Sequence, residues 1–141
     1  MLFRSYVTTG GFDTHSGQAN TQPGLLRAVS DSVAAFYADL AARGMDGDVV
    51  TLMWTEFGRR VRENGSGGTD HGTATPVFVF GGGVRGGLYG ETPSLRDLDE
   101  NGDLRFNTDF RSVYATLLAR WFGTDPKDVL GSSHRDLGFL G

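Results

Sequence analysis

Two continuous apolar runs, each ending abruptly in a polar and glycine-rich segment, constrain the fold of this chain more than any other feature. The run VVTLMWT follows Asp48 and stops at Glu56, and the run PVFVFG stops in a series of glycines. An apolar run without polar alternation is typical of a strand that is buried on both faces. The sequence therefore predicts an α/β fold.

Helical periodicity and a short N-terminal strand pattern mark the first part of the chain. Residues 2–8 are predicted to form a strand that ends at Gly11. Apolar residues spaced three and four apart then predict a helix over about 22–43. Thr21 is expected to cap this helix, and Gly44 is expected to end it.

The second half of the chain predicts three more elements. Residues 84–90 are expected to form an edge strand, and the segment LRDLDENGDLRF is expected to form a hairpin that turns at 101–102. A helix capped by Thr108 or Asp109 and ended by Gly123 follows. Its apolar stripe consists of Phe110, Val113, Tyr114, Leu117, Leu118, Trp121 and Phe122. This order of elements predicts an α/β sandwich with a largely parallel core.

Acidic and histidine side chains follow the expected strand ends. Asp13 and His15 lie in the loop after the first strand, Glu56 follows the first apolar run, and Asp70 and His71 lie in the second glycine-rich segment. Ligands in open α/β sheets bind beyond the carboxyl ends of the strands. The chain has no cysteine, and carboxylates combined with imidazoles suit Zn²⁺, Mn²⁺ or Fe²⁺. These five residues are therefore candidate metal ligands.

Each of these groups also has a purely structural interpretation. An Asp-x-His pair in a loop is often a hydrogen-bonded turn. Asp70 and His71 are also compatible with a turn or a helix cap. Glu56 is also compatible with an ion pair to Arg59 or Arg60.

The remaining motifs give weaker indications of a functional site. His134 lacks a comparable context and is expected at the surface. The segment from Asp97 resembles the first half of a calcium loop, but position nine is Arg105 and position twelve is Thr108 rather than a bidentate glutamate. The sequence GVRGG lacks the lysine and hydroxyl residue of a phosphate loop.

Composition excludes several classes of protein. The formal net charge is −4 and the arginines form no basic stripe, which argues against a nucleic-acid partner. No apolar run approaches the ~20 residues of a membrane span.

The 141 residues fit one domain. Because strand-like sequence begins at the second residue, we expect residues 1–141 to be a single partial domain truncated at its N-terminus.

Three segments in this order resemble a bacterial family called domain of unknown function 1501: GGFDTHSGQ, TEFGRRVRENGSGGTDHGTATPVFVFGGGVRGGLYG and DFRSVYATLLARWFG. That family is grouped with sulfatases and alkaline phosphatases. The resemblance covers nearly the whole chain and only the C-terminal portion of the family. It implies part of an alkaline-phosphatase-like α/β/α sandwich, and it implies that full-length relatives are exported to the periplasm.

The sequence also resembles another member of this superfamily, cofactor-independent phosphoglycerate mutase, in the order of its metal-binding motifs. This resemblance implies that Asp13, His15 and His71 hold a first metal ion and that Glu56 stands where a second metal finds a carboxylate. Phe57 replaces the histidine expected after that carboxylate. The Asp-x-His spacing is also tighter than the usual Asp-x-x-x-His. An alternative alignment makes residues 70–72 the Asp-His-Gly motif.

The function implied is that of a metal-dependent phosphate or sulfate ester hydrolase, with Zn²⁺ or Mn²⁺ as the expected cofactor and the ester substrate unidentified. The superfamily's nucleophile belongs to the N-terminal half, so no catalytic residue is assigned in this chain and the isolated chain is expected to be inactive. Its expected partner is the missing half or a second copy. The alternatives are a degenerate binding domain without metal and a mononuclear metal enzyme with a His/carboxylate triad.

Overall fold

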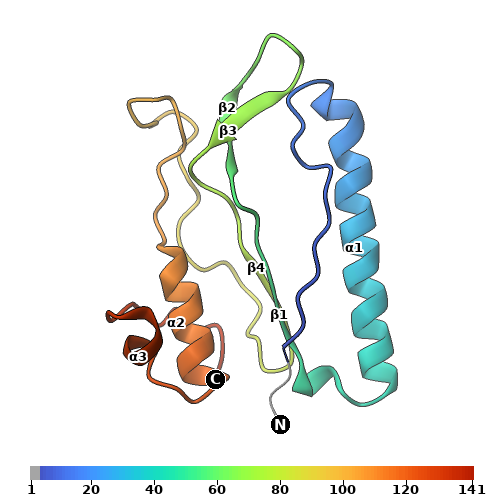
Figure 1. The fold of residues 1–141 in the computed structure, drawn as a ribbon, viewed down its shortest axis with the longest axis vertical. Helices are drawn as coiled ribbons and strands as arrows, with labels where there is room; N and C mark the ends of the chain where they lie inside the picture. The colour runs from blue at the N-terminus through green and yellow to red at the C-terminus, as the bar shows by residue number, and fades with distance from the viewer. Residues whose placement is uncertain (1–3) are drawn as a thin grey trace.

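The computed structural model describes residues 4–141, and these residues form a mixed α/β structure. Its elements in chain order are α1 (Gln18–Ala42), a short 3₁₀ helix (Asp46–Asp48), β1 (Val50–Met53), β2 (Gly58–Glu63), β3 (Thr69–Gly72), β4 (Phe78–Gly81), α2 (Phe110–Arg120) and α3 (Pro126–Leu130). Figure 1 shows β1 and β4 in the middle of the molecule, with α1 on one side and α2 and α3 on the other. Within residues 4–141, none of the helices combines the length and the apolar character needed to cross a membrane.

Strands β1 and β4 pair with each other in an antiparallel register that runs from Val50 opposite Gly81 to Met53 opposite Phe78. The prediction of a largely parallel core is therefore wrong for the described strands, which pair only in antiparallel fashion. Parallel neighbours need a crossover, usually a helix, between them. Here the intervening residues 58–72 form a separate hairpin instead, so the chain returns along β1 in the opposite direction.

The β1–β4 pair has neighbours on both faces, but its residues are half-buried and Phe78 is exposed, so the predicted burial on both faces is confirmed only in part. On one face Val50, Leu52 and Val79 pack against a core. The buried residues of that core are Val113, Leu117, Phe139 and Leu140. On the other face the hydroxyl of Tyr37 in α1 lies 2.9 Å from both the Thr51 hydroxyl and the Phe80 carbonyl. Alternate residues of each strand therefore face either the apolar core or Tyr37 of α1.

Helix α1 begins four residues before the predicted start, at Gln18, and the predicted cap at Thr21 is wrong. Its N-cap is Gly17, which has a positive φ of 55°. The backbone N–H groups of Gly17 and Gln18 donate to the carbonyls of residues 66–67, at 3.1 and 2.9 Å. The tip of the β2–β3 hairpin therefore takes the place of a side-chain cap. The predicted end of the helix at Gly44, whose φ is 66°, is confirmed.

The β2–β3 hairpin occupies the polar, glycine-rich segment after the first apolar run, for which the sequence predicted no strand. Its antiparallel register places Gly58 opposite Gly72, Arg59 opposite His71 and Glu63 opposite Thr69, with an irregularity between the last two pairs. Both strands are polar on both faces, so they lack the period-two alternation by which a strand is recognised. Sequence patterning therefore could not distinguish this hairpin from a loop.

The predicted strand over 2–8 is wrong where the structure describes it. Residues 4–10 are exposed and form no strand pairing. Residues 2 and 3 lie outside the described part of the chain. A strand pattern becomes a strand only where a neighbouring edge accepts its hydrogen bonds, and no described strand does so here.

The C-terminal part follows the predictions more closely. Asp109 caps α2 by accepting a hydrogen bond of 2.8 Å from the backbone N–H of Arg111, which confirms one of the two proposed caps. The expected edge strand over 84–90 is reduced to one bridge from Val84. The expected hairpin over 95–106 is likewise reduced to a single bridge beside its turn.

Candidate metal centre

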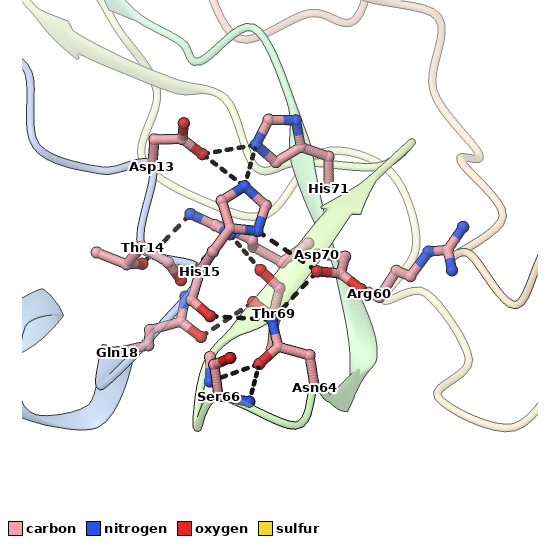
Figure 2. A network of polar contacts seen from close by, with 12 residues as sticks. Asp13, Thr14, His15, Gln18, Arg60, Asn64, Ser66, Thr69, Asp70 and His71 are labelled. Carbon is pink, nitrogen blue, oxygen red and sulfur yellow. Dashed lines mark hydrogen bonds and ion pairs between the residues drawn. The ribbon is translucent and has the colours of Figure 1, made fainter.

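Three of the predicted ligands meet where the loop before α1 lies against the β2–β3 hairpin (Figures 1 and 2). Asp13 and His15 come from the loop, and His71 comes from β3. The Nε2 atom of His71 lies 2.7 Å from Oδ1 of Asp13, and Nε2 of His15 lies 2.9 Å from the same oxygen. The two Nε2 atoms are 3.2 Å apart. One oxygen and two nitrogens thus form a small triangle.

The size of this triangle matches one face of a metal coordination shell. An octahedral ion with bonds of ~2.0–2.2 Å separates neighbouring ligand atoms by about 2.8–3.1 Å, whereas a tetrahedral ion separates them by about 3.3–3.6 Å. The observed separations of 2.7, 2.9 and 3.2 Å fall around the octahedral value. The donor set of two imidazoles and one carboxylate suits Zn²⁺, Mn²⁺ or Fe²⁺. The residues present therefore fit a divalent ion.

The triangle is open to solvent on one side. The side chains of Asp13, His15 and His71 are 65%, 45% and 47% exposed. The hydrogen bond with His71 lowers the pKa of Asp13 from its ordinary value, and both imidazoles and Arg59 act in the same direction. Asp13 is therefore ionised at neutral pH, which is the form that a metal ion requires of a carboxylate.

Arg59 connects the loop that carries Asp13 and His15, here called the ligand loop, to the β2–β3 hairpin. From β2 its guanidinium donates to the carbonyls of Phe12 and Thr14 in the loop and of Thr69 in β3. It also lies 3.2 Å from the hydroxyl of Thr14, which is buried. Because the guanidinium is occupied by backbone oxygens, the alternative interpretation in which Arg59 pairs with Glu56 finds no support.

Gly68 allows the ligand loop to approach the hairpin backbone. A Cβ atom at this position would lie 2.4 Å from the carbonyl carbon and oxygen of His15 and 2.8 Å from the nitrogen of Ser16. Real Cβ atoms do not approach other heavy atoms so closely. The absence of a side chain at Gly68 therefore permits the close approach of the two segments that carry the candidate ligands.

A family model described as "Protein of unknown function (DUF1501)" matches residues 6–132, which include every candidate ligand. The chain belongs to this family. No curated protein and no solved structure gives a significant match. The resemblance that the sequence motifs indicated is thus confirmed at the level of the family.

In this DUF1501 chain, the other two predicted ligands lie outside the triangle. Asp70 approaches His15 from the far side of its ring, with Oδ1 3.4 Å from Nδ1. A hydrogen bond from Asn64 lowers the pKa of Asp70 from its ordinary value. Glu56 is exposed in the bend between β1 and β2, and it is not part of the group whose ligand atoms cluster.

Phe57, at the position where the resemblance implied a histidine, lies against the candidate ligand His71. Its ring stacks on the imidazole of His71 with centroids 3.8 Å apart and planes 10° from parallel. The guanidinium of Arg59 lies 5.1 Å from the centroid of the same ring. Phe57 therefore limits the orientations open to His71, whereas sequence reasoning treated it only as a missing ligand.

Sequence reasoning also missed Asn64, whose amide contacts both the loop and the hairpin (Figure 2). The sequence Asn64-Gly-Ser-Gly indicates a turn, and only the fold shows that the loop packs on it. His134, expected at the surface, is half-buried and lies 2.9 Å from the hydroxyl of Ser132. It takes no part in the described cluster.

Proposed function

We propose that Asp13, His15 and His71 bind one divalent metal ion, Zn²⁺ or Mn²⁺, and that the protein is a phosphate or sulfate ester hydrolase-like member of its family. The proposal rests on one observation, which is the convergence of three ligand atoms within 3.2 Å of one another. The hydrolase class comes from the motif resemblance to sulfatases and alkaline phosphatases. An alkaline-phosphatase-like sandwich belongs to the same proposal.

The convergence is difficult to explain as a local turn. A turn accounts for the proximity of Asp13 and His15, which are neighbours in the chain. It does not account for His71, which is 56 residues beyond His15 and is nevertheless in contact with it. A proton on Nε2 of His71 satisfies its contact with Asp13, but a lone pair on Nε2 of His15 then faces the same carboxylate oxygen and is repelled unless a cation lies between them. A bound cation would relieve this repulsion.

The residues of the site would have different roles in binding the ion. Asp13 offsets part of the charge of the ion, and the two imidazoles bind as neutral ligands that leave it a net positive charge. A divalent ion in such a setting lowers the pKa of bound water and polarises an ester oxygen. The exposed side of the triangle leaves room for both water and an oxyanion.

A single metal ion is the form of the site that the contacts favour. Glu56 does not join the cluster, and Phe57 covers one side of His71. The buried hydroxyl of Thr14, the residue between Asp13 and His15, is occupied by Arg59 and Gln22. We therefore assign no nucleophile and expect no turnover of aryl phosphates or aryl sulfates by this chain, with or without added metal.

The mononuclear His/carboxylate enzyme is the second candidate, because the ligand separations match one face of an octahedron. Three positions on the opposite face would then be open, as in non-haem iron oxygenases. Oxygen consumption that depends on Fe²⁺ and on His15 would favour this candidate over a hydrolase.

Metal binding itself is tested by titration calorimetry with Zn²⁺ and Mn²⁺. We expect one ion per chain, loss of binding in His71→Ala, and unchanged binding in the matched control His134→Ala. Equal binding by the two variants would refute the assignment. No binding by the wild-type chain would instead indicate a degenerate binding domain.

A further inference from the structure

Asp70 and Asn64 lie beside His15, which like Asp13 comes from the loop before α1 rather than from a strand (Figure 2). The imidazole of His15 turns Nε2 toward Asp13 and His71 and turns Nδ1 toward the carboxylate of Asp70. When Nδ1 carries the proton and donates it to a carboxylate, Nε2 keeps its lone pair for a metal ion. Asp70 is therefore placed to select the ligand nitrogen of His15.

Asn64 holds both the main chain of His15 and the carboxylate of Asp70. Its Nδ2 atom donates to the His15 carbonyl at 3.0 Å and to Oδ1 of Asp70 at 3.1 Å. Its Oδ1 atom accepts from the backbone N–H groups of Ser66 and Gly68, at 2.9 and 3.1 Å. Since two N–H donors require the oxygen on their side, the amide can present only its NH₂ group to His15 and Asp70.

The hairpin thus contributes to the site in two ways. It supplies His71 directly from β3, and it reaches across to fix the backbone and the ring of His15 through two side chains that are not ligands. Outer contacts of this kind orient metal-binding imidazoles in proteins, and their loss typically lowers metal affinity by roughly 10–100-fold.

We propose that Asp70 and Asn64 are positioning residues that hold His15 in the orientation and tautomer needed to bind the metal ion. This inference rests on the proposed metal site and goes beyond it by giving Asp70 an orienting role in place of direct ligation. It also explains why a loop residue can act as a ligand without being buried.

The first test compares the Zn²⁺ or Mn²⁺ affinity of Asp70→Ala and Asp70→Asn with that of the wild-type chain. We expect a loss of roughly 10–100-fold in Asp70→Ala. We expect partial recovery in Asp70→Asn, because its amide oxygen still accepts a hydrogen bond from Nδ1. The matched control is Asp97→Ala, which removes a carboxylate at the same 3.4 Å from a cationic partner, Arg105. It should leave the affinity unchanged.

The second test uses Asn64→Asp, which keeps the oxygen that accepts from Ser66 and Gly68 but removes the NH₂ donor. Its metal affinity should fall to a similar extent as in Asp70→Ala. For each variant, the thermal unfolding midpoint of the metal-free protein should match the wild type. In the metal-free wild type at a pH where imidazoles are neutral, nitrogen NMR of His15 should show the proton on Nδ1. In Asp70→Ala that preference should weaken.

The outcomes separate the two proposals. A wild-type chain that binds no metal would contradict the proposed function. A wild-type chain that binds metal, with Asp70→Ala equal to it, would leave the metal site in place and overturn the positioning role. A fall in the metal-free unfolding midpoint that accompanies the loss of affinity, without recovery in Asp70→Asn, would also overturn it, because the contacts would then be merely structural.

Discussion

Replacing Gly68 with alanine is the perturbation that most directly links the backbone geometry to the metal site. The new Cβ atom would stand 2.4 Å from the carbonyl carbon and oxygen of His15. Non-bonded carbon atoms are at their optimal separation at roughly 3.5–4.0 Å. The ligand loop and the hairpin would therefore have to separate by about 1 Å. Gly68 has no positive φ, so the strain comes from this contact and not from its own backbone conformation.

A displacement of this size is large for a coordination site. Metal–ligand distances are held to about ±0.2 Å, so a shift of about 1 Å removes His15 from the shell unless the loop rearranges. We expect the affinity for Zn²⁺ or Mn²⁺ to fall by at least ~100-fold, the upper end of the effect of losing an outer contact. The free energy of unfolding should fall by roughly 1–3 kcal/mol, as in other overpacked sites.

Titration calorimetry and thermal unfolding of the Gly68→Ala variant measure these two effects. The matched control is Gly65→Ala, in the same hairpin tip, because a Cβ atom there meets nothing within 4 Å and the residue has no positive φ. The control should bind metal like the wild-type chain. Wild-type affinity in Gly68→Ala would refute the reasoning, since it would show that the site does not depend on this close approach.

Three further substitutions give distinct results. Phe57→Ala removes the ring stacked on His71, and we expect roughly tenfold weaker metal binding by calorimetry; unchanged binding would show that the stacking is incidental. Glu56→Gln should leave one metal ion per chain with unchanged affinity, and a lower stoichiometry would reveal a second site. Asp109→Asn tests the cap of α2, where hydrogen bonds from Arg111 lower the pKa of Asp109 to about 2. The ionised carboxylate therefore favours folding above its unfolded pKa of 3.8, and this contribution is lost as the pH falls from ~4 to ~2. The stability of the variant, measured by urea unfolding, should depend less on pH in this window than that of the wild type, and parallel pH profiles would contradict the role of the cap.

Sequence patterning located the elements whose apolar residues reach the core. The runs around Leu52 and Val79 indicated strands, and both segments form strands, although their residues are only half-buried. The helix capped by Asp109 follows from a side chain suited to the cap and from a stripe in which Val113 and Leu117 reach the core. The expected stripe is wrong at Phe110 and Phe122, which are exposed, whereas the polar Ser112 and Thr116 are buried.

The elements that patterning missed depend on contacts between distant segments. The β2–β3 hairpin is polar on both faces, so its strands carry no signal of alternation. The start of α1 is set by the carbonyls of the hairpin tip and not by a capping residue near Thr21. The direction of β4 relative to β1 follows from the hairpin between them, which the sequence did not reveal.

The candidate site was likewise predictable from the sequence only in part. The residue types of Asp13, His15 and His71 indicated metal chemistry, and the fold brings these three together. Their supporting residues could not be found in this way. Asn64 has a turn-like sequence context, and its role depends on the packing of a loop that is 49 residues away in the chain.

Diffraction at the absorption edge of zinc or manganese, from crystals of the metal-loaded protein, would locate the bound ion. We expect one anomalous peak per chain, bonded at ~2.0–2.2 Å to Oδ1 of Asp13 and to Nε2 of both His15 and His71. We also expect Asp70 to contact Nδ1 of His15 and not the ion. A peak on other residues, or no peak when the metal is saturating in solution, would show that these three residues do not form a metal site.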